Sequence, residues 1–142
     1  MSAAAAFPRP EIDPLSAPYW EALGKGYLLY QRCDACGKAW LPARSQCPGC
    51  LSPEHRWVPA SGGAKLISWV VYHRAFNPAF QDRVPYNVAV VELDEGARLI
   101  SNIVGLDPET DIGTQLHIDQ PLRLAIRHEQ GVAIPAFLRA PE

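Results

Sequence analysis

The sequence predicts a mainly β fold, with short helices at the N-terminus, a small metal-binding ribbon and a domain of five strands. Proline and glycine are abundant, with 14 and 10 among 142 residues, which favours short strands and shaped loops over long helices. All four cysteines fall within residues 33–50. Beyond them, strand-like apolar segments recur at short intervals, which is typical of a β domain.

Composition excludes several classes of protein. Hydrophobic residues make up 48% and charged residues 20%, the balance of a globular chain, and 142 residues are too few for a large catalytic barrel. The net charge of −2 gives no positive field that would recruit a phosphate backbone. No apolar run is long enough to span a bilayer and residues 1–6 lack a basic leader, so we expect a cytoplasmic protein.

Residues 1–26 form the expected N-terminal tail and helical region. The Ala- and Pro-rich residues 1–12 should be poorly ordered unless a partner holds them. Capping residues followed by prolines at positions 13–18 then predict one or two short helices. Tyr19 and Trp20 supply an aromatic face, which must pack on the body of the protein or on another subunit.

The metal motif lies in the predicted ribbon, residues 27–60. The spacing C-x₂-C-x₁₀-C-x₂-C brings four thiolates to one tetrahedral site, and we predict one structural Zn²⁺ per chain. The predicted ligands are Cys33, Cys36, Cys47 and Cys50. Rubredoxin-like iron is the alternative metal, while two disulfides are disfavoured in a reducing compartment. His55 is surplus to a complete set of four cysteines.

Residues 61–142 form the expected strand domain, which begins after a flexible Gly-rich joint at 61–64. Alternation of apolar and polar residues at 122–127 predicts a sheet with one face in water. The five predicted strands are 65–73, 86–93, 98–104, 121–127 and 132–138.

The connection 72–86 is the main candidate for a binding surface, because long shaped loops usually have a function. Its aromatics offer apolar contact, and its arginines suit phosphate or carboxylate. The candidate ligand contacts are Tyr72, His73, Arg74, Arg83 and Tyr86. An equally weighted alternative is a self-packed loop whose Phe76, Phe80 and Tyr86 plug the end of the barrel formed by the strands.

The chain carries no recognised catalytic motif. It lacks nucleophile-elbow, phosphate-loop and zinc-protease patterns, and nothing near His73, His117 or His128 marks a triad. From the residues alone this indicates a binding module.

Several short motifs in a fixed order resemble one family. They include Tyr19-Trp20, Gly26-Tyr27-Leu28-Leu29, Gln31-Arg32-Cys33 ahead of Cys36-Gly37, Pro42-Ala43-Arg44 before Cys47-Pro48, Trp57, Val71-Tyr72-His73-Arg74, Val84-Pro85-Tyr86, Val91-Glu92-Leu93-Asp94-Glu95-Gly96, Leu99-Ile100-Ser101-Asn102 and Ile112-Gly113. Over most of its length the chain resembles small proteins with an N-terminal helix pair, a rubredoxin-like zinc ribbon and a C-terminal OB-fold.

That resemblance implies a function as well as a fold. Such proteins are non-catalytic companions of thiolases, thiolase-like aldolases and acyltransferases, or are fused to or paired with hydratases acting on acyl-CoA. It implies a hetero-oligomer in which this chain is an accessory subunit and acyl-CoA lies at a shared site. The helices and ribbon would grip the partner, and the candidate partner contacts are Tyr19, Trp20, Trp40, Phe76 and Phe80.

Two other functions stay open on sequence grounds. Zinc ribbons and OB-folds also occur in nucleic-acid-binding modules, although those usually place aromatics in a positively charged groove, and here the charge is missing. A self-standing enzyme using His73 is the third hypothesis.

Overall fold

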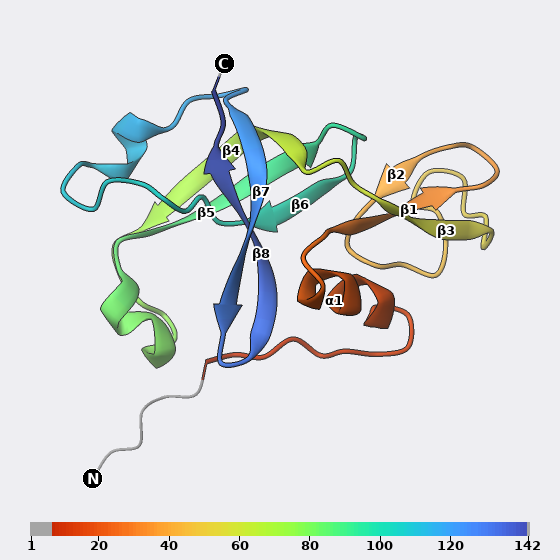
Figure 1. Cartoon of the computed structure of the whole chain (residues 1–142), viewed down its shortest axis with the longest axis horizontal. Coiled ribbons are helices and arrows are strands. Elements are labelled where there is room, and N and C mark those ends of the chain that lie inside the picture. Colours follow the sequence, from red (N-terminus) through yellow and green to blue (C-terminus); the bar gives the residue numbers. More distant parts are fainter. Residues whose placement is uncertain (1–6, 142) are drawn as a thin grey trace, which may run out of the picture.

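The structure is a computed structural model that describes residues 7–141 (Figure 1). It confirms the mainly β prediction, because one short α-helix accompanies eight strands within the described residues. The elements are α1 (Ala17–Gly24), β1 (Leu29–Cys33), β2 (Ala39–Trp40), β3 (His55–Pro59), β4 (Gly63–Tyr72), β5 (Tyr86–Leu93), β6 (Arg98–Ser101), β7 (Pro121–Glu129) and β8 (Val132–Arg139), with 3₁₀ helices η1 (Pro78–Arg83) and η2 (Ile112–Gln115).

The ribbon is a three-stranded antiparallel sheet in the order β2-β1-β3. The second sheet has five strands in the order β6-β5-β4-β7-β8, all paired antiparallel. The long strand β4 pairs with both β5 and β7, and a bulge between Leu66 and Ser68 bends it. The sheet therefore curls as an OB-fold barrel does.

A short segment after β6 closes the curled sheet. Ile103 forms a parallel bridge with Phe137, where the Val104 N–H donates to the Phe137 carbonyl at 2.9 Å. Asn87 holds this segment from β5, because its side-chain amide donates to the Ile103 carbonyl at 2.9 Å and accepts from the Ile103 N–H at 2.7 Å. The buried amide thus substitutes for a strand partner.

Helix, ribbon and barrel share one apolar core. Leu23 of α1 and Tyr30 of β1 are 1% and 2% exposed, and they belong to the same buried cluster as Leu66 and Phe137 of the barrel. In Figure 1, α1 lies between the ribbon and the strands β7 and β8, and it contacts β1 and β8. The ribbon is thereby fixed against the barrel.

The N-terminal region holds a single α-helix, in line with the one or two expected from the residues, whereas the resemblance implied a pair; residues 14–16 form only a turn. Two other sequence expectations need correction. The strand expected at 98–104 ends at Ser101, because the chain then leaves β5 to meet Phe137. The joint at 61–64 is not flexible, because β4 already begins at Gly63 and the Ser61 N–H donates to Glu95 at 2.7 Å.

The N-terminal segment also differs from expectation. Phe7 is 8% exposed, its ring centroid lies 5.3 Å from that of Phe80, and the Arg83 guanidinium lies 4.8 Å from its centre. Arg9 donates to the Gln130 carbonyl at 3.2 Å. Residues 7–9 are therefore anchored on the barrel, while residues 1–6 of the expected tail lie outside the described residues. Within residues 7–141, no helix has the length and apolarity to cross a membrane.

Candidate functional site

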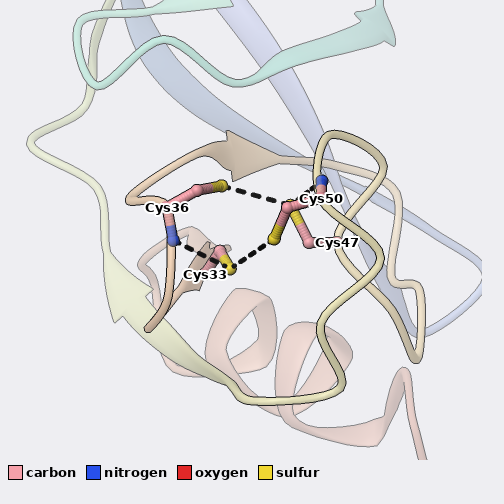
Figure 2. A group of neighbouring side chains, drawn as sticks. All are labelled: Cys33, Cys36, Cys47 and Cys50. Carbon is pink, nitrogen blue, oxygen red and sulfur yellow. Dashed lines mark hydrogen bonds between the residues drawn. The ribbon is translucent and has the colours of Figure 1, made fainter.

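The four predicted ligands converge at one end of the ribbon (Figure 2). Their sulfur atoms all lie within 4.8 Å of one another. Cys33 and Cys50 approach to 3.5 Å, and Cys36 and Cys47 to 3.6 Å. A disulfide needs about 2.05 Å, whereas a tetrahedron of 2.3 Å metal–sulfur bonds has edges of about 3.8 Å. The arrangement therefore suits a metal better than two disulfides.

Each knuckle points backbone N–H groups at its first cysteine. The Ala35 and Cys36 N–H groups donate to Cys33 Sγ at 3.3 and 3.4 Å. The Gly49 and Cys50 N–H groups donate to Cys47 Sγ at 3.3 and 3.5 Å. These donors favour thiolates, and stabilise the negative charge that four cysteines bring to a divalent cation.

The same donors shift the pKa of the thiols. The Cys36 N–H is the largest cause that holds the pKa of Cys33 below its ordinary value. Burial opposes ionisation of Cys47, but hydrogen bonds from the N–H groups of Cys50 and Gly49 and from the Cys36 and Cys50 thiols together outweigh it and lower its pKa to about 6. For Cys50 the Ser52 N–H favours the thiolate, yet the neighbouring sulfurs raise the pKa to about 11. A metal cation would remove that repulsion.

The two knuckles close with different residues. Gly37 has φ +78°, and its N–H donates to the Cys33 carbonyl at 3.0 Å. Leu51 takes the equivalent place in the second knuckle, with φ 67° and an N–H that donates to the Cys47 carbonyl at 2.9 Å. The left-handed conformation is strained for leucine, and Leu51 is 67% exposed. The second knuckle therefore holds its turn with a residue poorly suited to it.

Trp40 packs against the cysteine cluster, and His55 packs against Trp40. Trp40 is 4% exposed, clusters with Cys33 and Cys47, and has its ring centroid 5.7 Å from that of His55. Gln31 accepts from the Arg44 N–H at 2.7 Å through Oε1, so its Nε2 donates to His55 Nδ1 at 3.2 Å. Both aromatic rings thus form the interior of the ribbon, and Trp40 offers no free face to a partner.

The aromatic side chains of the connection 72–86 stack in a row. Tyr72 and Tyr86 are cross-strand partners whose centroids lie 5.3 Å apart, and Phe80 stacks on Tyr86 at 5.5 Å. Phe76 touches Tyr72 edge-on at 6.1 Å and is 76% exposed. None of these residues belongs to the barrel core cluster. The row lies along the surface between η1 and the start of β5.

The charged residues of this region differ in whether they form ion pairs. Arg83 pairs with both oxygens of Glu129 at 2.6 and 2.7 Å, and Arg127 donates to the same carboxylate at 2.7 Å. The Arg83 hydrogen bonds are the main cause that lowers the pKa of Glu129. Arg74 is exposed and lies 5.7 Å from the centre of the Phe76 ring, while His73 is exposed on the same loop. Of the two arginines predicted to meet a ligand, only Arg74 is outside an ion pair among residues 7–141.

A groove of about 820 Å³ lies among the described residues. It brings together parts that are distant in the chain: α1, the loop after β2, strands β5 and β6, and the start of β8. Its apolar walls include Trp20, Leu41 and Ile100, and one end holds Arg83, Arg127 and Glu129. A smaller, more polar cavity of about 490 Å³ lies beside His73 and residues 107–112.

Sequence reasoning named part of this groove and missed the rest. It had singled out Tyr19, Trp20, Phe80, Arg83 and Tyr86, all of which line the groove. It missed Leu41, Ile100 and Arg127, which lie on other elements. Ile100 carried a usable signal, because an apolar residue stands at the outward position of a strand whose inward positions are Leu99 and Ser101.

Comparison with known proteins shows which family models and which solved structure resemble this chain. Residues 20–56 match the family model described as "ChsH2, rubredoxin-like zinc ribbon domain", and residues 57–127 match "ChsH2, C-terminal OB-fold domain". One chain of a solved structure, "Ltp2-ChsH2(DUF35) aldolase", is 35% identical with a TM-score of 0.76, covering 92% of this chain and 98% of that one.

Two curated relatives are also similar. A "DUF35 domain-containing scaffold protein" from Methanocaldococcus jannaschii is 34% identical over 99 residues, which are 68% of this chain and 70% of that protein. A "Probable enoyl-CoA hydratase alpha subunit" from Thermomonospora curvata is 40% identical over 113 residues, which are 79% of this chain but only 35% of that protein. On its sequence and its fold, the chain belongs to the DUF35 family, built from a ChsH2-type rubredoxin-like zinc ribbon and a C-terminal OB-fold domain.

Proposed function

We propose that this chain is a non-catalytic accessory subunit that binds a thiolase-like or related acyl-CoA enzyme and helps to form its acyl-CoA site. The observation that carries the proposal is the likeness, over 92% of this chain, to a chain of the solved Ltp2-ChsH2(DUF35) aldolase. Relatives named scaffold proteins support an accessory role. The partner enzyme would then supply the catalytic groups.

In this role the metal is one structural Zn²⁺ per chain. Four thiolates complete a tetrahedral set, which leaves no open position for water or substrate. The metal would hold the knuckles, and through β1 it would hold α1 against the barrel, since Tyr30 and Leu23 share one core. Zinc thus stabilises the groove without taking part in chemistry.

We propose the same partner contacts as from the sequence, but their exposure separates those that a partner can touch from one that is buried. Tyr19, Trp20 and Phe80 line the groove, and Phe76 is 76% exposed, so these side chains are accessible to a partner. Trp40 would act indirectly, by filling the ribbon interior. On the 72–86 loop, Arg74 is the cation available for a CoA phosphate.

The test is isolation of the native complex with identification of its subunits. We expect a stoichiometric thiolase-like enzyme, and an assembled complex whose affinity for CoA falls about tenfold or more in Arg74→Ala, as loss of a charge-assisted hydrogen bond predicts. Arg123→Ala is the matched control, because Arg123 is an exposed arginine on β7 outside both cavities. A chain that purifies alone and is dispensable for the activity of every acyl-CoA enzyme tested would refute the proposal.

A hydratase is the second candidate partner. The chain is 40% identical to part of a protein named as a hydratase alpha subunit and 31% identical to part of another, "3-oxo-4,17-pregnadiene-20-carboxyl-CoA hydratase alpha subunit" from Mycobacterium tuberculosis. Identification of the subunits in the native complex distinguishes the two partners directly.

A further inference from the structure

Gln31 is a polar side chain enclosed in the ribbon. It is 0% exposed and stands on β1, where it pairs with Trp40 of β2 on one side and with Trp57 of β3 on the other. A buried side-chain amide is costly unless its oxygen and its nitrogen both find partners. The partners of Gln31 therefore show what this residue does in the fold.

The two ends of the Gln31 amide bind the two ends of the loop that carries the second knuckle. Its Oε1 accepts from the Arg44 N–H at 2.7 Å, just ahead of that knuckle. Its Nε2 donates to His55 Nδ1 at 3.2 Å, just behind the knuckle. One side chain thus closes the base of the segment 44–55, which contains two of the four cysteines.

The chain ahead of the second knuckle has few other ties. Residues 41–46 belong to no strand, and among the described residues they make no hydrogen bond besides that of the Arg44 N–H to Gln31. The chain behind the knuckle is held better, because β3 begins at His55 and pairs with β1 from that residue onward. The entry to the second knuckle thus depends most on Gln31.

The first knuckle is held by different contacts. Arg32, whose neighbouring position on β1 points to the opposite face, donates to the Gly37 carbonyl at 2.8 Å. Asp34 of the same knuckle forms an ion pair with Arg56 of β3. Gln31 takes part in neither contact. Its loss should therefore loosen one knuckle and spare the other.

We propose that Gln31 is a positioning residue for the metal centre, which holds the second knuckle in place before the metal binds. Because the loop is already ordered, the metal does not have to supply the free energy of ordering Cys47 and Cys50. Gln31 is not a ligand and acts only through the chain that carries these two cysteines. The inference rests on the metal proposed above and not on the accessory role.

The experiment measures the zinc affinity of the full chain by competition with a chromophoric chelator. Methionine keeps the volume of Gln31 and removes both hydrogen bonds, so Gln31→Met should weaken zinc binding about 10- to 100-fold. Gln120→Met is the matched control, because Gln120 is a buried glutamine of the barrel whose Oε1 accepts from the His117 N–H at 3.2 Å. It should lower Tm but leave zinc affinity unchanged, since its cost is the same with and without zinc.

Amide hydrogen exchange in the zinc-loaded variants separates positioning from general stability. In Gln31→Met, the N–H groups at 49–51 should exchange faster, while those at 35–37 keep their protection. Arg32→Met should give the reverse pattern, because it removes the donor to the Gly37 carbonyl. A residue that merely stabilises the ribbon would change both knuckles alike.

His55→Phe removes the Nδ1 acceptor and keeps an aromatic ring against Trp40. Zinc binding should weaken less than in Gln31→Met, and the double variant should bind zinc no more weakly than Gln31→Met alone, because both changes remove the same contact. This variant also carries the exchange comparison if Gln31→Met does not fold.

Three results would overturn the inference: unchanged zinc affinity in Gln31→Met, an equal loss of zinc affinity in Gln120→Met, or equal loss of protection in both knuckles. Elemental analysis of the wild type tests the metal itself, and isolation of the native complex tests the accessory role. Each of the three claims can therefore fail without the others.

Discussion

Asn87 is predicted to hold the barrel closed. In Asn87→Ala the Ile103 N–H and carbonyl both lose their side-chain partner, while Ile103 itself is 3% exposed. A buried backbone group left without a partner costs about 1–3 kcal/mol, so the two together should lower the free energy of unfolding by about 2–4 kcal/mol, allowing for partial entry of water. For a domain of this size, that corresponds to a fall in Tm of about 3 °C for each kcal/mol.

Chemical denaturation at pH 7, followed by circular dichroism, measures the effect. Asn77→Ala is the control, because Asn77 is an exposed asparagine with one side-chain hydrogen bond, to the Ala79 N–H at 2.9 Å. Its loss should cost about 1 kcal/mol or less. Asn87→Asp adds a second test, since it keeps the acceptor but turns the donor into a carboxylate oxygen facing the Ile103 carbonyl. It should be less destabilised at a pH where that carboxyl is protonated. Equal, small losses for Asn87→Ala and Asn77→Ala would refute this explanation of the closure.

Three further predictions concern the metal knuckles and the charged end of the groove. Leu51→Gly should raise the free energy of unfolding of the metal-loaded chain by about 0.5–1 kcal/mol, because Leu51 has a strained left-handed backbone and its exposed side chain contributes little packing. Gly37→Ala should lower the free energy of unfolding by about 1 kcal/mol, because it places a side chain on the same left-handed backbone. Cys36→Ser should lower the zinc content by about one equivalent per chain, measured by elemental analysis. Hydrogen-exchange protection should be lost in β1–β3 while it persists in β4–β8. Iron in the wild type, or unchanged protection in the variant, would contradict this prediction. Glu129→Gln should lower the free energy of unfolding above about pH 5, and the difference from the wild type should shrink as pH falls below about 4. The reason is that the pKa of Glu129 is lowered in the fold and its ion pair is lost when the carboxylate is protonated. A difference that grows on acidification would contradict the assigned pairing.

The parts that sequence predicts well are those that local chemistry decides. The cysteine spacing places all four sulfurs together because each x₂ turn is self-contained. Strand β5 has the predicted bounds, 86–93, because a tyrosine and three valines give this run a high strand propensity. In both cases neighbouring residues carry the whole signal.

The parts that sequence misses depend on distant contacts. Arg83 was predicted to meet a ligand, but its strongest contact is Glu129, which lies 46 residues away in the chain. Phe7 carried no periodic pattern that would show its burial against Phe80. The groove itself needs α1, the ribbon loop and the barrel in their final places, so no single segment encodes it.

Turnover of acyl-CoA by the separated and recombined subunits tests the central claim most directly. The enzyme that copurifies with this chain is assayed alone, with the zinc-loaded chain added back, and against the chain alone at the same concentration. An accessory role predicts no turnover by the chain alone, weak or no turnover by the enzyme alone, and recovery of full activity as the chain reaches a stoichiometric amount. Full activity of the enzyme without the chain, or turnover by the chain alone, would contradict it.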